Sequence, residues 1–390
     1  MAEKYRKTII SCYLGYIIQA SVNNLTPLLF VRFGFEFGVT AEKLAFLIIA
    51  NFGIQILVDA NSASAVLKFG YKKCSYCSYS LCILGLVGLG TLPYITPPFI
   101  GILVSTALTA IGGGFLEVVV SPIIEALPLK NKSGAMSFLH SFYSWGHISV
   151  IAISTVYFNV FGINNWRYLP FIWAILPLIN IFLFIKAPVV NPEGDARPVT
   201  VKKLFRFKSF PLFFVMILAA GAAEQAIAQW ASYFAEIGLS IENKTMGDLA
   251  GGCLFAFGMA LTRTVYGFIG DKVDLKKVMA VSAILLTAAF LTASLAPVPI
   301  ISLAAVAASG LFVGIMWPGI YSLAGKNFPE GGTKMFGLLA LGGDIGCTLG
   351  PFLVGIVSSD IKIGLLAATA FPILLVICLT AFGLKSKNFQ

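Results

Sequence analysis

Charged residues are scarce in this chain of 390 residues. Lys, Arg, Asp and Glu together account for 11% of it, against about 25% in an ordinary soluble protein. Hydrophobic residues account for 58%, and apolar runs of about 20 residues, each long enough to cross a hydrocarbon core about 30 Å thick, recur from end to end. The composition excludes a soluble globular protein and predicts an all-α polytopic membrane protein.

The motifs of soluble enzymes are missing too. The sequence has no Walker loop to hold ATP phosphates, no G-x-S-x-G nucleophile turn and no H-E-x-x-H zinc motif. Among two histidines and seven cysteines there is one C-x-x-C pair, Cys74 and Cys77, and no second pair or nearby His completes a zinc set. We therefore expect no enzyme activity, no metal site and no cofactor.

Basic residues are distributed unevenly along the chain, whose net charge is +10. Of the 27 Lys and Arg residues, 21 fall in segments on the N-terminal side of the membrane, five fall in the opposite loops, and Arg263 lies within a span. Basic residues favour the cytoplasmic side, so we expect both termini in the cytoplasm and no nucleic acid as a partner. The twelve predicted spans are 8–31, 42–67, 74–92, 98–126, 135–160, 166–186, 209–235, 246–270, 277–296, 298–325, 335–358 and 361–384.

A polar segment divides the chain near its middle. Residues 187–208 contain Pro, Gly and charge without an apolar period, which is typical of a linker. We therefore expect six-helix bundles at 1–186 and 209–390. Pro122 and Pro318 hold comparable positions in the two halves, each followed by a basic turn and another span. A six-plus-six repeat is typical of transporters whose site lies at the membrane midplane.

Two carboxylates fall near the middle of predicted spans. Glu117 lies about 13 Å from the inner end of its span, at 1.5 Å per residue, and Glu224 is near the centre of another. A charge at this depth costs about 3 kcal/mol or more, so each marks a site for substrate or protons. The alternative for each is a structural ion pair or a hydrogen bond between helices.

Amide, aromatic and imidazole side chains accompany these acids. Such groups suit a hydroxyl-rich ligand, whose OH groups need donors and acceptors and whose CH faces stack on rings. Asn23 and Asn24 precede Pro27, a pattern that favours a bent helix lining a cavity. Interhelical hydrogen bonding and apolar packing are the alternatives. The predicted cavity residues of this kind are Asn23, Asn24, His140, Tyr143, Gln225, Gln229, Trp230, Tyr233, Trp317 and Tyr321.

Four further charged residues lie nearer the inner ends of spans or in the loop that follows one. They are Asp59, Arg263, Asp271 and Asp344. We interpret them as gating or structural charges rather than substrate contacts.

Several motifs carry a resemblance to a known family. They include GFIGDKVDLKK at 267–277 after Arg263, and GGDIGCTLGP at 342–351. With the twelve spans in two halves, the whole chain resembles the major facilitator superfamily. Three shorter motifs are similar to its fucose-permease-like branch of sugar/proton symporters: LEVVVSP at 116–122, Asn23-Asn24-Leu25, and WPGIYSL at 317–323 followed by Lys326-Asn327.

The resemblance implies roles for particular residues. Glu117 matches the family's acid in the fourth span, which contacts sugar and takes part in proton coupling, and Asn23-Asn24 matches its amide pair in the first span. Two residues after Asn-Asn-Leu the family's sugar permeases have an aspartate, and this chain has Pro27. The proton stoichiometry and the sugar therefore stay open, and Glu224, Asp59 or a histidine are possible substitutes for that aspartate.

These features together predict a secondary active transporter of the cytoplasmic membrane. It would move a small polar solute, with a sugar as the favoured cargo, by alternating access and proton-coupled import. The expected partners are the solute, protons and membrane lipid, and we expect a monomer. One alternative is a proton-coupled exporter of drugs or amphipathic metabolites, and another is a non-transporting membrane sensor or scaffold. The sequence fixes neither the substrate nor the direction nor the coupling ion.

Overall fold

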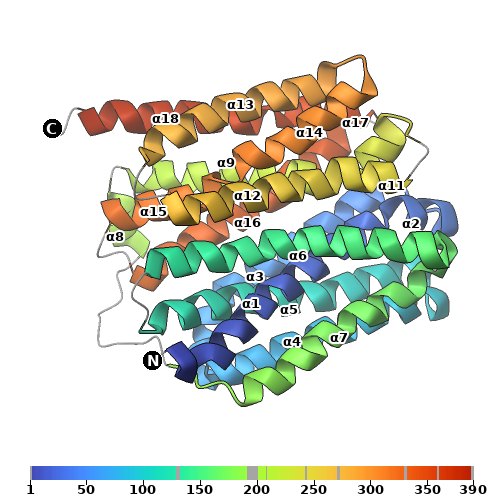
Figure 1. Ribbon diagram of the computed structural model, residues 1–390, viewed down its shortest axis with the longest axis horizontal. Coiled ribbons are helices and arrows are strands. Elements are labelled where there is room, and N and C mark those ends of the chain that lie inside the picture. Colours follow the sequence, from blue (N-terminus) through green and yellow to red (C-terminus); the bar gives the residue numbers. More distant parts are fainter. Residues whose placement is uncertain are drawn as a thin grey trace. The chain divides into compact units, whose positions relative to one another are not determined.

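The computed structural model describes residues 2–128, 132–190, 201–207, 209–241, 244–269, 273–328, 332–357 and 360–387. Over these residues the chain is helical and contains no β-strand. It forms two compact units, Met1–Gly194 (unit 1) and Asp195–Gln390 (unit 2), coloured from blue to green and from yellow-green to red in Figure 1. The division falls inside the predicted linker, part of which forms a short helix, Val201–Arg206.

Unit 1 is built from long apolar helices, because a helix satisfies every backbone hydrogen bond within one segment. Helices α4 and α5 pack closely, since a Cβ on Gly85 would meet Thr109 of α5 and one on Gly112 would meet Cys82 of α4. The elements of unit 1 are α1 (Ala2–Leu28), α2 (Phe30–Phe37), α3 (Ala41–Phe69), α4 (Tyr71–Ile95), α5 (Pro98–Ala126), α6 (Lys132–Phe161), η1 (Ile163–Tyr168) and α7 (Leu169–Ile185).

Unit 2 repeats this pattern with more interruptions, including the π-helical turns η2 and η3. Its elements are α8 (Val201–Arg206), α9 (Phe210–Ala228), α10 (Ala231–Tyr233), η2 (Phe234–Gly238), α11 (Lys244–Gly247), η3 (Asp248–Cys253), α12 (Leu254–Ile269), α13 (Leu275–Leu295), α14 (Pro299–Val313), α15 (Met316–Asn327), α16 (Gly332–Val357), α17 (Ile361–Ala368) and α18 (Ala370–Lys387).

The predicted spans agree with these helices. Among the described residues, ten helices are long and apolar enough to cross a membrane, or eleven when the bent pair α1/α2 counts as one span. The remaining predicted span, 135–160, is α6, a 30-residue helix rich in hydroxyl and ring side chains. The twelve-helix membrane fold is therefore confirmed. The location of the termini in the cytoplasm stays a prediction.

Prolines accompany the breaks in two of the spans. Pro27 lies two residues before Leu29, where α1 and α2 meet at 44°, as the sequence predicts for a bent first span. Pro318 lies in the first turn of α15 and has no N–H to donate to the Gly314 carbonyl four residues earlier. The tenth span accordingly divides into α14 and α15, and the Gly314 carbonyl lacks its usual helical partner.

Glycines set the distance between α9 and α16 in unit 2. A Cβ on Gly346 would overlap the Leu218 carbonyl, and a Cβ on Gly350 would overlap the Ala222 carbonyl. The two helix backbones therefore meet directly, as small residues permit in membrane helices.

Gly346→Ala is expected to destabilise unit 2 by about 1–3 kcal/mol, the usual cost of overpacking, because the added methyl group overlaps the Leu218 carbonyl. Gly337→Ala on the same helix is the control, since nothing lies within 4 Å of a Cβ there. The control should be neutral or slightly stabilising, because alanine restricts the unfolded chain. Denaturant unfolding in detergent measures both, and equal losses of stability would contradict the prediction.

Candidate functional site

Three successive glycines, Gly112–Gly114, bring α5 against three other helices of unit 1. Successive helical residues point about 100° apart. A Cβ on the first glycine would meet α4, one on the second would meet α1, and one on the third would meet α3. The helices therefore converge about one turn before Glu117.

The Glu117 carboxylate contacts α1. Gln19 Nε2 donates to Glu117 Oε2 at 2.6 Å. Gln19 is 3% exposed, and Glu117 is partly buried. The predicted acid thus lies within unit 1, hydrogen-bonded to an amide of the first span.

An amide cluster extends from this pair along α1 and α3. Asn23 Oδ1 accepts hydrogen bonds from Gln55 Nε2 at 3.2 Å and from Asn51 Nδ2 at 3.5 Å. The neighbouring Asn24 contacts α6 instead, where its Nδ2 donates to the Tyr143 hydroxyl at 3.4 Å. The structure therefore brings Asn23, Asn24 and Tyr143, all predicted from the sequence, into one polar region with Glu117.

Three amide oxygens of this region are buried and accept no hydrogen bond within the described part of the chain. They are Gln19 Oε1, Asn24 Oδ1 and Asn51 Oδ1. An unpaired buried acceptor costs about 1–3 kcal/mol, and such atoms call for a specific explanation. All three are acceptors, so the region is suited to a ligand that donates O–H or N–H groups.

Tyr16 connects α1 to both α5 and α6. Its hydroxyl lies 2.8 Å from Ser121 Oγ of α5. Its ring meets the His140 imidazole edge to face, with ring centres 5.1 Å apart. The predicted residue His140 therefore contacts the helix that carries Gln19 and Asn23.

In unit 2 a predicted site acid and a predicted gating charge form one ion pair. Arg263 Nη2 of α12 donates to Glu224 Oε2 of α9 at 2.8 Å, and both side chains are 5% exposed. Arg263 Nε also donates to the Gly314 carbonyl at 3.3 Å, the group that Pro318 leaves without its helical partner. This geometry favours the structural ion pair that was the alternative for Glu224.

The other predicted residues of α9 and α10 contact groups within unit 2. Gln229 Nε2 donates to Gln225 Oε1 at 2.9 Å. Trp230 Nε1 donates to the Pro351 carbonyl of α16 at 2.9 Å, and the ring meets Tyr233 edge to face with centres 5.3 Å apart. Trp230 lies in the turn between α9 and α10, and its indole therefore joins that turn to α16.

The aromatic pair of α15 packs against α16. Trp317 and Tyr321 stack with ring centres 6.1 Å apart, and the Trp317 ring occupies the space in front of Gly343. Trp317 Nε1 is buried and finds no acceptor among the described residues. Asp344, one of the predicted gating charges, is the next residue and is 3% exposed.

The remaining predicted charges are placed less fully. Asp59 is partly buried on α3, whereas Asp271 lies outside the described residues. The described residues contain no group of three or more His, Cys, Asp or Glu side chains able to hold a metal ion.

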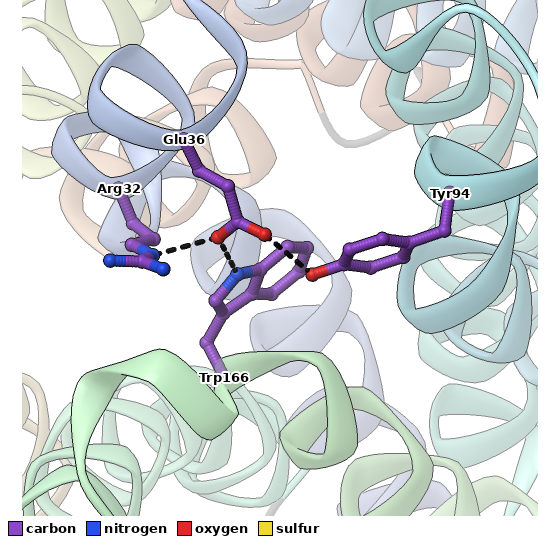
Figure 2. Close-up of polar contacts among 4 residues, drawn as sticks. All are labelled: Arg32, Glu36, Tyr94 and Trp166. Atoms are coloured by element: carbon purple, nitrogen blue, oxygen red, sulfur yellow. Dashed lines mark hydrogen bonds and ion pairs between the residues drawn. The ribbon is translucent and has the colours of Figure 1, made fainter.

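A second carboxylate cluster of unit 1 lies at the far end of the bent first span. Glu36 of α2 accepts hydrogen bonds from Arg32 Nε at 2.8 Å, Trp166 Nε1 at 2.7 Å and the Tyr94 hydroxyl at 2.8 Å, as Figure 2 shows. The Arg167 guanidinium lies 4.3 Å from the Tyr94 ring centre. These contacts join α2 to α4 and η1.

Unit 2 has a comparable cluster after its own first span. Lys244 Nζ lies 3.0 Å from Glu236 Oε1 and 3.0 Å from Asp248 Oδ1. Glu236 lies outside the candidate spans. Burial raises the pKa of its carboxyl, and the charge of Lys244 opposes that shift.

Trp166→Phe is expected to destabilise unit 1 by about 1.5–3 kcal/mol, because the variant loses a hydrogen bond to a charged group. Trp173→Phe is the matched control, since Trp173 Nε1 donates to the neutral Ser154 Oγ at the longer distance of 3.4 Å. Denaturant unfolding of the detergent-solubilised protein measures both variants. A loss in the control as large as that in Trp166→Phe would count against the role of Glu36.

Comparisons with known proteins identify this architecture. The family model described as "Major Facilitator Superfamily" matches residues 12–252 and 238–388. The chain belongs to the major facilitator superfamily. No curated relative matches it in sequence.

Solved structures of superfamily transporters share the fold. The E. coli fucose:proton symporter FucP is 18% identical over 97% of this chain and 98% of that chain, with a TM-score of 0.67. FucP in the outward conformation is 17% identical over 95% of this chain and 97% of that chain, with a TM-score of 0.66. The proton:xylose symporter XylE bound to 6-bromo-6-deoxy-D-glucose is 12% identical over 98% of this chain and 96% of that chain, with a TM-score of 0.73. As a major facilitator superfamily member, this chain is a secondary transporter and not an enzyme.

The sequence prediction missed Gln19, which donates a hydrogen bond to Glu117. A signal for it was present, because Gln19 and Asn23 are four residues apart and so share a helix face. Tyr16 continues that face three residues earlier. The Glu36 cluster was also missed, since its partners come from three separate elements.

Proposed function

We propose that this transporter carries a small, hydroxyl-rich solute of the sugar class together with protons, by alternating access. The observation that carries the proposal is the contact of Glu117 with Gln19 inside a cluster of buried amides. An ionisable residue at membrane depth marks a substrate or proton pathway. Buried amides supply fixed donors and acceptors for hydroxyl groups.

The polarity of the cluster supports a sugar. Three buried amide oxygens need donors, and each sugar hydroxyl supplies a donor as well as acceptor lone pairs. The similar solved structures include a fucose:proton symporter and a proton:xylose symporter, which agrees with a sugar and proton pair here.

The alternatives fit the cluster less well. Amphipathic drugs offer few hydrogen-bond donors, so they would leave most of the three amide oxygens unpaired. A non-transporting scaffold gains nothing from an acid and unpaired acceptors in its interior, because each lowers stability.

Individual residues take different roles in this proposal. Glu117 binds the proton and a solute hydroxyl, while Asn23, Asn24 and Tyr143 bind further hydroxyls. The His140 ring contacts the ring of Tyr16, which lies on the same helix as Asn23 and Asn24. For the polar and aromatic side chains of unit 2, solute binding stays a prediction from the sequence; they are Gln225, Gln229, Tyr233, Trp317 and Tyr321.

The uneven distribution of basic residues supports a location in the cytoplasmic membrane with both termini inside the cell. Import is the proposed direction, driven by protons entering with the solute.

Transport by the purified protein in liposomes tests the proposal. Labelled fucose, xylose and glucose are offered with and without an imposed inward proton gradient, and a labelled hydrophobic cation is offered in parallel. We expect at least one sugar to accumulate when the inward proton gradient is imposed and not to accumulate without it. Movement of the cation without movement of any sugar, or no movement of any solute, would overturn the proposal.

A further inference from the structure

The side-chain amide of Gln19 is only half used. Its Nε2 donates to Glu117 Oε2 at 2.6 Å, whereas its Oε1 is buried and accepts nothing from the described residues. The residue is 3% exposed, so bulk water does not satisfy this oxygen. The amide therefore donates to Glu117 through Nε2, while its acceptor Oε1 has no donor among the described residues.

The protonation state of a carboxyl decides which group of a neighbouring amide it can bind. An ionised carboxylate only accepts hydrogen bonds, so the NH₂ group must face it. A protonated carboxyl carries an O–H donor, and the amide oxygen is then its best partner. The terminal torsion of glutamine is broad and roughly two-fold, so the two orientations differ by a half-turn that moves no other atom.

We propose that Gln19 is a positioning residue that converts the protonation of Glu117 into a reversal of the hydrogen-bond polarity offered to the solute. When Glu117 is charged, Gln19 offers the solute an acceptor, Oε1. When a proton binds Glu117, its O–H donates to Oε1, and Nε2 turns to offer the solute a donor. This inference rests on the proposed function, because it uses Glu117 as the proton site.

The packing of α1 against α5 places the Gln19 amide next to Glu117. Gln19 lies on α1, one of four helices packed against α5, and the Gly113 position meets Gln19 and Asn23 directly. These helices carry other titratable groups, so the test isolates the contribution of Glu117 by substituting it. Those along this stretch are Tyr16 of α1, Asp59 of α3, Tyr79 and Cys82 of α4, and His140, Tyr143 and His147 of α6.

Infrared difference spectroscopy tests the reversal without any ligand. The purified protein is labelled with glutamine carrying ¹³C in the side-chain carbonyl, which separates these bands from the backbone. Spectra at acidic and alkaline pH should show a carboxylic acid band and a shifted glutamine band with the same midpoint. Glu117→Met should lose both bands. A glutamine band that does not follow the carboxyl titration in the unsubstituted protein would overturn the inference.

Two substitutions assign the glutamine band. Gln19→Met should lose it and keep the carboxylic acid band. Gln55→Met is the matched control, because Gln55 belongs to the same amide cluster but donates to Asn23, and it should keep both. A band that survives in Gln19→Met belongs to another glutamine and also overturns the inference.

A solute readout separates this inference from the proposed function. Analogues of a transported sugar, each with one hydroxyl replaced by fluorine, lose a donor at one position. For one position, the affinity ratio of sugar to analogue should change about tenfold between alkaline and acidic pH, the effect of one hydrogen bond, and should be constant in Gln19→Met. If no sugar binds, the proposed function fails while the infrared test still decides the reversal. If sugar binding is normal but the ratio is equally pH-dependent in Gln19→Met, only the reversal fails.

Discussion

Arg263→Met is expected to destabilise unit 2 by about 3–5 kcal/mol, the cost of removing one partner from a buried ion pair. The Glu224 side chain, which is 5% exposed, would lose the guanidinium that lies 2.8 Å away. The Gly314 carbonyl would also lose its donor, and Pro318 prevents the helix from supplying another. Denaturant unfolding in detergent, monitored by tryptophan fluorescence, measures the loss of stability.

The double variant Glu224→Met/Arg263→Met distinguishes an unpaired charge from lost packing. Replacing both partners of a buried pair by apolar residues is often neutral or stabilising, so the double variant should be more stable than Arg263→Met. A double variant as unstable as the single one would contradict the explanation.

Arg32→Met is the matched control for Arg263→Met. Arg32 also pairs with a glutamate, but the two side chains of that pair are 22% and 21% exposed, and Glu36 keeps two other donors. The expected loss is at most about 1 kcal/mol, as for partly solvated pairs. A loss as large as that of Arg263→Met would refute the role given to burial.

Glu117→Gln is expected to abolish proton-driven accumulation of the solute while solute exchange continues. The amide keeps the size and hydrogen-bonding capacity of the acid but binds no proton at physiological pH. A gradient of one pH unit stores about 1.4 kcal/mol per proton, which supports about tenfold accumulation for one proton per solute. The accumulation ratio should therefore fall from about ten to one, as measured with labelled sugar in liposomes.

Glu36→Gln is the control for this experiment. Glu36 is another carboxylate of unit 1, but its partners Trp166 and Tyr94 belong to the cluster at the far end of the first span. Its accumulation ratio should match that of the unsubstituted protein. Retention of accumulation in Glu117→Gln, or an equal loss in Glu36→Gln, would remove Glu117 from the coupling mechanism.

The sequence was sufficient for the helices because length and hydropathy are local properties. The bent first span followed from amides before Pro27, and the structure shows a 44° bend there. Even α6, which is rich in hydroxyl and ring side chains, was among the predicted spans, as 135–160.

The contacts of the site were less predictable, because a sequence gives depth along a helix but not the neighbouring helix. Glu224 and Arg263 were assigned to different groups, yet they form one ion pair. Gln19 was missed although it lies on the same face as Asn23, since nothing in α1 alone indicates that Glu117 faces it. Such pairings depend on helix rotation and crossing, which the packing of glycines decides.

The glycine run Gly112–Gly114 also limits how this protein diversifies. At that level a Cβ on α5 would overlap α4 at the first glycine and would crowd α1 and α3 at the next two, so these backbones form a frame with little room for larger side chains. If the proposed function holds, new solute preferences should arise mainly by exchange of the polar groups beside this frame, such as Gln19, Asn23 and Gln55. Relatives that differ in cargo should keep the frame and vary these amides.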